Sequence, residues 1–273
     1  KMEHVNKLSD IQHPAAREVL KFLKIKQGVE IHHDGDLPAR TGLGSSSAFT
    51  VGLLHAFYAL KGEMPTKDRL AREAIYIERE MCKEYVGCQD QIMCANGGMN
   101  LVEFKGEDEF DIREVTLKKE IIQNLQSHLM LYFTGFSRFA SEIALHQIQN
   151  MENRNVEMER MREMVFEGLG HLQGNDMKSF GKLLDEGWKI KRTLSDKISS
   201  THIDHIYSTA RKAGAWGGKL LGAGGGGFMI LFVPPHKQKA VKEHLKKLLL
   251  VPVKIENMGT RIIFYQEENG YKV

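Results

Sequence analysis

The stretch LPARTGLGSSSAFTVGLLHAF, residues 37–57, places a proline, two glycines and three consecutive serines directly before an apolar run with helical spacing. This spacing predicts a helix over about 45–60, and alternation in VEIHH, residues 29–33, predicts a strand before the loop. Glycines just before a helix let a ligand approach the unpaired N–H groups of its amino end, which also carries a partial positive charge. The segment is therefore typical of a phosphate-binding loop, and a serine-rich helix cap after a tight turn is the alternative.

Three common glycine motifs do not account for this loop. The P-loop needs a lysine immediately before its serine or threonine, and here no lysine precedes the serines. The dinucleotide-binding motif GxGxxG fails because Ser47 stands where the third glycine should be, and the hydrolase motif GxSxG fails as well. A second run, GAGGGG at 222–227, fits GxGxxG by letters, but the residues after it predict a strand instead of a helix. Its glycines predict that the backbone passes very close to another loop or to a ligand.

The composition is that of an ordinary globular protein. The chain has 273 residues, 42% of them hydrophobic and 27% charged, with a net charge of +3. This balance argues against a nucleic-acid partner, and no apolar run reaches the roughly 18 residues of a membrane-spanning helix. Three cysteines without a CxxC pair fit a reducing compartment and predict neither disulfides nor a metal site. We therefore expect a cytoplasmic protein with neither a nucleic-acid nor a membrane partner.

Helix and strand signals continue along the rest of the chain, without internal repeats or low-complexity linkers. Thr66 is the predicted N-cap of a second helix, and helical patterns follow over about 138–170, 176–194, 202–213 and 236–249. Strands are predicted in GGMNLVEF, SHLMLYFTG, the apolar run after the second glycine run, VPVKIEN and RIIFYQ. A boundary between two domains is expected within 110–127, where charged residues cluster between strands.

The segment IEREMCKEYVGCQDQ, residues 77–91, offers a second candidate for chemistry. Its acidic residues Glu78, Glu80 and Asp90 are predicted to lie on a helix and the loop after it. Phosphoryl transfer uses one carboxylate to hold a metal ion and another to orient or deprotonate the attacking hydroxyl. The segment could supply both, and a solvated helix face is the alternative interpretation of the same charges.

Taken together, these segments resemble the GHMP kinase superfamily. PARTGLGSSSA, residues 38–48, is similar to its second motif, P-x-x-x-G-L-G-S-S-x-A, and KLLGAGGGGF is similar to its third. Within the superfamily, VGCQDQIMCANGGMNLVEF, LYFTGFSRFASEI and LGAGGGGFMILFV are similar to the D-glycero-D-manno-heptose 7-phosphate kinases, so that the resemblance covers nearly the whole chain. It implies an α+β fold of two domains, an N-terminal one like ribosomal protein S5 and a C-terminal ferredoxin-like α/β one.

The resemblance implies an ATP-binding domain over 1–120 and a C-terminal kinase domain over 121–273. The superfamily's first motif is an amino-terminal strand with a substrate-contacting arginine or lysine and a glycine-rich turn. The residues before Pro38 contain no match to it, and the chain begins with Lys1 instead of methionine. We therefore expect that the sequence lacks the first strands of the N-terminal domain.

The resemblance also assigns site residues. Asp90 would be the catalytic base or orienting group, Ser46 and Glu78 would hold Mg²⁺, and Glu80 would be an ordinary surface glutamate. ATP would be bound by Pro38, Gly42, Leu43, Gly44, Ser45, Ser46 and Ser47. The substrate would be bound by Gly98, Thr134, Gly135, Arg138, Gly224 and Gly225. Phe136 replaces the first arginine of the TGRSR pattern of the heptose kinases.

The function that the resemblance implies is a transferase of carbohydrate metabolism. With ATP and Mg²⁺ it would phosphorylate a sugar phosphate, namely D-glycero-D-manno-heptose 7-phosphate at its anomeric hydroxyl, in nucleotide-sugar synthesis for surface glycans. Two alternatives stay open: another GHMP sugar kinase, similar to galactokinase or fucokinase, and a nucleotide-binding module without turnover. The expected partner is a small-molecule sugar phosphate, and the expected assembly is a monomer or a homodimer.

Overall fold

The computed structural model describes residues 2–37, 41–106, 109–135, 144–145 and 154–266. The chain folds into two compact units. Unit 1 comprises Lys1–Ala39, Gly44–Glu114 and Glu256–Val273, and unit 2 comprises Arg40–Leu43 and Val115–Ile255. None of the helices in these described ranges is long and apolar enough to cross a membrane.

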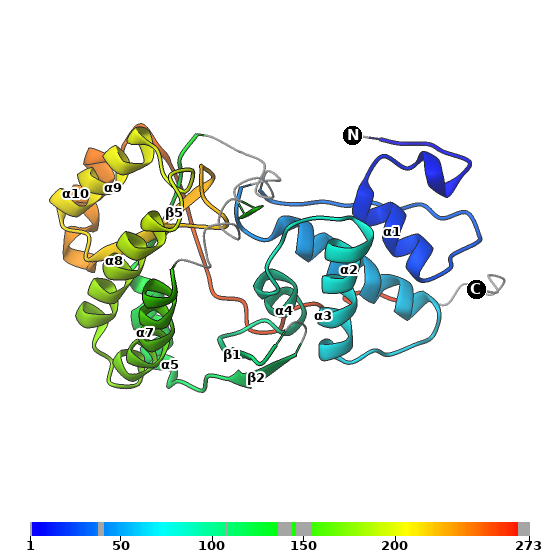
Figure 1. The fold of residues 1–273 in the computed structure, drawn as a ribbon, viewed down its shortest axis with the longest axis horizontal. Helices are drawn as coiled ribbons and strands as arrows, with labels where there is room; N and C mark the ends of the chain where they lie inside the picture. Colours follow the sequence, from blue (N-terminus) through cyan, green and yellow to red (C-terminus); the bar gives the residue numbers. More distant parts are fainter. Residues whose placement is uncertain (1, 38–40, 107–108, 136–143, 146–153, 267–273) are drawn as a thin grey trace. The chain divides into compact units, whose positions relative to one another are not determined.

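Unit 1 is built mainly of helices that pack around one hydrophobic core (Figure 1). In chain order its elements are the 3₁₀-helix η1 (Leu8–Asp10), α1 (Pro14–Phe22), α2 (Ser45–Leu60), α3 (Lys67–Tyr76), the π-helix η2 (Ile77–Met81), α4 (Gln89–Asn96), β1 (Asn100–Phe104) and β2 (Phe110–Glu114). The Thr66 side chain caps α3 by accepting from Arg69 N at 3.1 Å, which confirms the predicted N-cap. The helices α2, α3 and α4 contact one another and bury Leu54, Leu70 and Ile92 between them.

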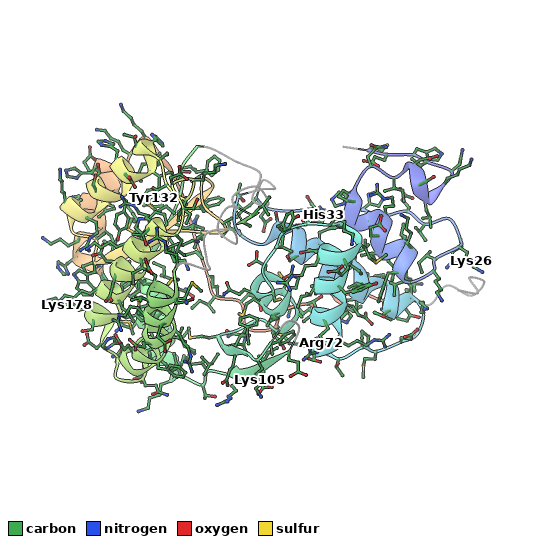
Figure 2. All side chains as sticks on the ribbon, in the orientation of Figure 1. Lys26, His33, Arg72, Lys105, Tyr132 and Lys178 are labelled. Atoms are coloured by element: carbon green, nitrogen blue, oxygen red, sulfur yellow. The ribbon has the colours of Figure 1, made fainter. Side chains whose placement is uncertain are left out.

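The strands β1 and β2 form an antiparallel ribbon in which Val102 pairs with Ile112. The guanidinium of Arg72, labelled in Figure 2, lies 4.2 Å from the centroid of the Phe110 ring and covers one face of it. This contact fastens the end of the ribbon to α3.

A returning carboxyl-terminal segment also belongs to unit 1. Backbone hydrogen bonds join Gly98 N to Glu256 O at 2.7 Å and Thr260 N to Cys94 O at 2.8 Å. The backbones of Gly97 and Gly259 cross in direct contact. A Cβ on Gly97 would lie only 2.0 Å from Gly259 N, so no side chain fits there. The compact units therefore do not follow the consecutive ranges 1–120 and 121–273: the chain after Ile255 packs with the amino-terminal half.

Unit 2 contains a four-stranded antiparallel sheet with the strand order β4-β5-β3-β6. Its elements are α5 (Lys119–Ser127), β3 (Leu129–Phe133), α7 (Asn155–Gln173), α8 (Met177–Thr193), α9 (Thr201–Ala213), β4 (Gly217–Leu220), β5 (Phe228–Phe232), the 3₁₀-helix η3 (Pro235–Lys237), α10 (Gln238–His244) and β6 (Leu249–Val251). The helix α8 packs directly on β4, where a Cβ on Gly217 would lie 1.9 Å from Gly181 O. In Figure 1, α7 lies beside α8 and α9 beside α10.

The structure confirms the predicted α+β class and most of the predicted helices, and it corrects several strands. The segment 29–33 is not a strand, because Val29 and Ile31 are exposed and no strand pairs with them among the described residues. RIIFYQ is also irregular, with the side chains of Ile263 and Phe264 in solvent, and VPVKIEN contributes only Val251 to β6. The helix expected over 236–249 ends at His244. Of the helix expected over 138–170, residues 138–143 and 146–153 lie outside the described residues.

Candidate active site

The amino end of α2 lacks a side-chain cap. The cap position is Gly44, whose left-handed backbone (φ 70°) turns the chain into the helix. The first intrahelical bond runs from Ala48 N to Gly44 O at 2.9 Å, so the N–H groups of the three serines before Ala48 have no partner of this kind. A bare helix amino end of this sort fits the phosphate-binding role that the sequence predicts.

Asp90 lies against this end of α2. A Cβ on Gly44 would be 3.3 Å from both Cβ and Cγ of Asp90 and 3.4 Å from its Oδ2. Asp90 belongs to the first turn of α4 and is exposed, while Cys94, one turn later, approaches Gly44 O with its Sγ at 3.9 Å. Burial, with the nearby charges of Asp90 and Glu78, raises the pKa of the Cys94 thiol to about 12. Cys94 is therefore a protonated packing residue beside the carboxylate.

Glu78 is buried below the same helix end, with 1% of its surface exposed. It lies in the π-helix η2, an irregular element that is frequent at functional sites. Its Oε2 accepts hydrogen bonds from Ser47 Oγ at 2.9 Å and from Gln91 Nε2, and its Oε1 accepts from Thr50 Oγ1 at 2.8 Å. Ser47, Thr50 and Gln91 are themselves buried. Three neutral donors from α2 and α4 thus fix the carboxylate in one position.

The charge of Glu78 has no cationic partner among the described residues. Burial raises the pKa of this carboxyl, an effect that the hydrogen bonds from Thr50, Ser47 and Gln91 oppose. Buried carboxylates in proteins are usually paired with a cation or coordinate a metal ion. Since Oε1 accepts only the Thr50 bond among those present, it retains a lone pair. Glu78 therefore fits a ligand of Mg²⁺, a hard cation that prefers carboxylate oxygen.

Ser46 and Ser47 have different surroundings. The Ser47 side chain is buried on Glu78, whereas Ser46 is exposed on the helix end. The structure therefore brings Ser47, which the sequence assigned to ATP, into direct contact with the carboxylate. Within the described residues, no group of three or more His, Cys, Asp or Glu side chains forms a metal site. A magnesium ion here would have Glu78 as its carboxylate and would complete its shell with hydroxyl, phosphate or water oxygens.

In unit 2, the second glycine run packs backbone to backbone on the beginning of the serine loop. A Cβ on Gly42 would lie 2.7 Å from Leu221 O, and one on Gly227 would lie 2.2 Å from Thr41 O. Phe228 N donates to Thr41 O at 3.1 Å, and the Thr134 hydroxyl donates to Gly227 O at 2.8 Å. The close approach predicted for this run is thus made by another loop of the chain.

Of the remaining predicted substrate residues, Gly98, Gly224 and Gly225 make backbone contacts. A Cβ on Gly224 would lie 2.8 Å from Ile198 O, and Gly225 N donates to the same oxygen at 2.9 Å. Gly135 has a left-handed backbone (φ 89°), and no described residue comes within 4 Å of its Cβ position. Gly98 contacts the returning segment at Glu256 and Asn257. Pro38 and Arg138 lie outside the described residues.

The structure divides the predicted residues between its two units. Gly44, the three serines, Glu78, Asp90 and Gly98 belong to unit 1, while Gly42, Leu43, Thr134, Gly135, Gly224 and Gly225 belong to unit 2. Sequence reasoning missed Thr50, Gln91 and Cys94. Thr50 follows Ser47 by three residues and so shares its face of the helix, which could have indicated a joint contact. Gln91 and Cys94 carried no comparable signal.

Comparisons with known proteins identify the family of the chain. Residues 11–98 match the family described as GHMP kinases N terminal domain, and residues 166–249 match GHMP kinases C terminal. A protein of Campylobacter jejuni named D-glycero-alpha-D-manno-heptose 7-phosphate kinase is 30% identical over 240 residues, which cover 85% of this chain and 69% of that protein. A mevalonate kinase of Methanocaldococcus jannaschii is 25% identical, with coverages of 85% and 71%.

Solved structures show the same fold. A D-glycero-D-manno-heptose 1-phosphate kinase from Bacteroides thetaiotaomicron superposes with a TM-score of 0.73 at 24% identity, over 93% of this chain and 74% of that one. The chain therefore belongs to the GHMP kinases. It is an ATP-dependent phosphotransferase that acts on a small molecule, and kinases of this family typically use Mg²⁺.

Proposed function

We propose that this kinase phosphorylates a heptose phosphate, D-glycero-D-manno-heptose 7-phosphate, at its anomeric hydroxyl, in nucleotide-sugar synthesis for surface glycans. The observation that supports this acceptor is the 30% identity to the Campylobacter jejuni heptose 7-phosphate kinase over most of the chain. The segments LYFTGFSRFASEI and VGCQDQIMCANGGMNLVEF, which lie outside the shared ATP motifs, carry the same resemblance. The two family domains are proposed to divide near residue 120.

The contact between Gly44 and Asp90 supports the chemical step. The N–H groups at the amino end of α2 donate to phosphate oxygens of ATP, with Gly42 to Ser47 lining them. Asp90 accepts a hydrogen bond from the attacking hydroxyl and takes its proton as the new bond to the γ-phosphorus forms. The bond to the β,γ-bridging oxygen breaks, and ADP leaves.

Glu78 and the Ser46 hydroxyl are the proposed holders of Mg²⁺. When bound, the ion neutralises phosphate charge and helps to orient the transferring group. The donors Ser47, Thr50 and Gln91 favour the ionised form of Glu78 and hold its carboxylate in place. Arg138 is proposed to bind the acceptor phosphate, because a guanidinium offers paired donors and stays charged.

Another sugar kinase of the superfamily is the second candidate. A fucokinase/GDP-fucose pyrophosphorylase of Arabidopsis thaliana is 25% identical over 84% of this chain. This identity is lower than that to the heptose kinase, so we place the fucose acceptor second.

The test is release of ADP from Mg-ATP with a panel of acceptors: heptose 7-phosphate, unphosphorylated heptose, galactose, fucose and mevalonate. We expect turnover with heptose 7-phosphate to exceed that with every other acceptor, and the Asp90→Asn protein supplies the background rate. Equal use of unphosphorylated sugars would contradict the acceptor and leave a sugar kinase. Release of ADP with none of them would instead favour a nucleotide-binding module.

A variant separates acceptor recognition from ATP binding. Arg138→Ala is expected to raise the KM for heptose 7-phosphate much more than the KM for ATP. An unchanged acceptor KM would remove Arg138 from the substrate site.

A further inference from the structure

Unit 2 has a basic hollow of about 670 Å³ that is separate from every residue assigned above. Three segments build it: the beginning of α8, the end of α9 with the turn into β4, and η3. The side chains that matter are Lys178, Arg211, Lys212, Trp216, His236 and Lys237. Among the described residues that line the hollow there is no carboxylate.

Most of the positive charge in this basic hollow is not neutralised. Arg211 is the exception, since its Nε lies 3.3 Å from Oδ1 of the buried Asp185. Lys178, Lys212 and Lys237 are exposed and form no ion pair within the described parts of the chain. Because the whole sequence has a net charge of only +3, three unpaired lysines at one hollow are a local concentration of charge.

The charges of two of these lysines have no evident role in the fold. Arg211 and Lys212 lie in the last turn of α9, where cations stabilise the negative end of a helix. Lys178 lies instead in the first turn of α8, where a cation is unfavourable, and Figure 2 labels it on the surface of unit 2. Lys237 is exposed in a short 3₁₀-helix and pairs with no acid there.

Two side chains of the hollow, Lys237 and Trp216, are held in place by their neighbours. The stem of Lys237 lies across Gly214, where a Cβ would be 2.9 Å from Lys237 Cγ. Trp216 is half-buried, with its ring 5.4 Å from that of His128 and its backbone N–H bonded to Phe232 O at 2.7 Å. A lysine held by packing and a fixed aromatic wall lose less entropy when a ligand binds.

We propose that this basic hollow binds a small anion with two or more phosphate groups, at a second site outside the catalytic one. Lys178 and Lys237 reach the anion from two sides, and Trp216 forms the wall against which its organic part packs. The volume is within the range of small-ligand sites, about 300–1,000 Å³. A nucleic acid would need a longer basic track than these few side chains provide. The phosphoryl transfer proposed above uses none of the residues that line this hollow.

The test uses pyrophosphate as the probe and tryptophan fluorescence as the signal. The chain has two tryptophans, and Trp188 is buried, so a change on binding reports Trp216. We expect a saturable change that Lys178→Gln/Lys237→Gln weakens at least about tenfold, since the variant loses two charge-assisted hydrogen bonds to the anion. The matched control is Lys239→Gln/Lys242→Gln, which removes two exposed charges from α10 outside the hollow. Calorimetry supplies a second readout. It compares the unaltered protein, the two double variants and Trp216→Phe.

Each result decides the proposal. Loss of pyrophosphate binding in the first double variant, with the control unchanged, would support it. No saturable binding in the unaltered protein by either method would overturn it, and so would equal binding by both double variants. Binding of polyglutamate but not of pyrophosphate, lost in Lys178→Gln/Lys237→Gln, would also overturn it and identify an acidic polypeptide as the partner.

Discussion

The Asp90 carboxyl group lies against the position that a Cβ on Gly44 would occupy, 3.3 Å from its Cγ, although 45 residues separate the two in the chain. This contact joins the amino end of α2, which offers N–H groups, to the first turn of α4, which offers a carboxylate. A phosphate bound at the helix end would thus lie close to the group that receives the acceptor's proton. The absence of a side chain at residue 44 is therefore as important as the presence of one at residue 90.

Gly44→Ala is expected to weaken ATP binding. The added Cβ must take a left-handed backbone (φ 70°), which costs about 1–2 kcal/mol, and it meets Asp90 at 3.3 Å. Calorimetric titration with ATP measures the loss. Gly52→Ala is the matched control, because it lies in the same helix with open space at its Cβ and should stabilise the protein by about 0.5–1 kcal/mol. Unchanged ATP affinity in a folded Gly44→Ala protein would rule out binding at this helix end.

Asp90→Asn is expected to retain ATP affinity and lose most turnover. The amide keeps the size of the side chain but cannot accept the proton of the acceptor hydroxyl. Turnover and ATP affinity are measured on the same preparation. Glu80→Gln is the control, since Glu80 is exposed and its ion pair with the Lys83 ammonium group, at 3.5 Å, lies on the surface. If Asp90→Asn keeps more than about a tenth of the turnover, a barrier change under about 1.4 kcal/mol, its assignment to the chemical step is wrong.

The pH dependence of stability tests Glu78. Its folded-state pKa is raised by burial, so the folded protein holds this proton more tightly than the unfolded chain does. The resulting stabilisation is complete below the ordinary value of 4.5 and is lost as the pH rises through the raised pKa. In metal-free buffer, the Tm of the unaltered protein should therefore fall relative to that of Glu78→Gln as the pH rises above 4.5.

Mg²⁺ with ATP should reverse this trend, because a cation beside Glu78 favours the ionised carboxylate. Glu78→Gln should also raise the Mg²⁺ concentration needed for half-maximal turnover. Glu80→Gln serves again as the control and should change neither quantity. A Tm difference independent of pH, together with an unaltered Mg²⁺ requirement, would show that Glu78 is a purely structural residue.

Local signals predicted much of the fold. The glycine-serine loop and apolar spacing predicted α2 with its observed bounds, and Thr66 predicted the start of α3. The strand expected over 29–33 was wrong because alternation describes a side-chain pattern, whereas a strand also needs a partner to pair with its backbone. The strand β4 was missed because Gly217 and Gly218 have no β propensity, and their place in the sheet depends on close packing under α8.

The site was less predictable than the fold. Motif resemblance indicated Gly44, Glu78 and Asp90, but spacing could not show that Asp90 would meet Gly44. The hydrogen bonds from Thr50 and Gln91 to Glu78 depend on the packing of α2 and α4 around η2, which is a tertiary property. The second glycine run predicted a close approach to either a loop or a ligand. The structure identifies Thr41 and Gly42 as neighbours of this run.

The two neighbouring serines should separate stability from metal use. Ser47→Ala removes a buried donor to Glu78 and should destabilise the protein by about 1–3 kcal/mol. Ser46→Ala alters an exposed side chain, so we expect a stability change within about 0.5 kcal/mol together with a higher Mg²⁺ requirement. Urea unfolding and Mg²⁺ titration of turnover measure the two effects. A higher Mg²⁺ requirement in Ser47→Ala alone would transfer the proposed metal contact from Ser46 to Ser47.

The last prediction concerns the glycine run of unit 2. Gly227 and Gly135 both have a left-handed backbone, with φ 97° and 89°, but among the described residues only Gly227 lies against another backbone segment. Gly135→Ala should therefore cost only the conformational strain of about 1–2 kcal/mol. Gly227→Ala adds a Cβ 2.2 Å from Thr41 O and should cost about 3 kcal/mol or more, because two backbone segments must separate. Urea unfolding followed by tryptophan fluorescence reports this unit, since Trp188 and Trp216 both belong to it. Equal destabilisation by the two substitutions would show that the contact between Gly227 and Thr41 is not close enough to constrain the loop.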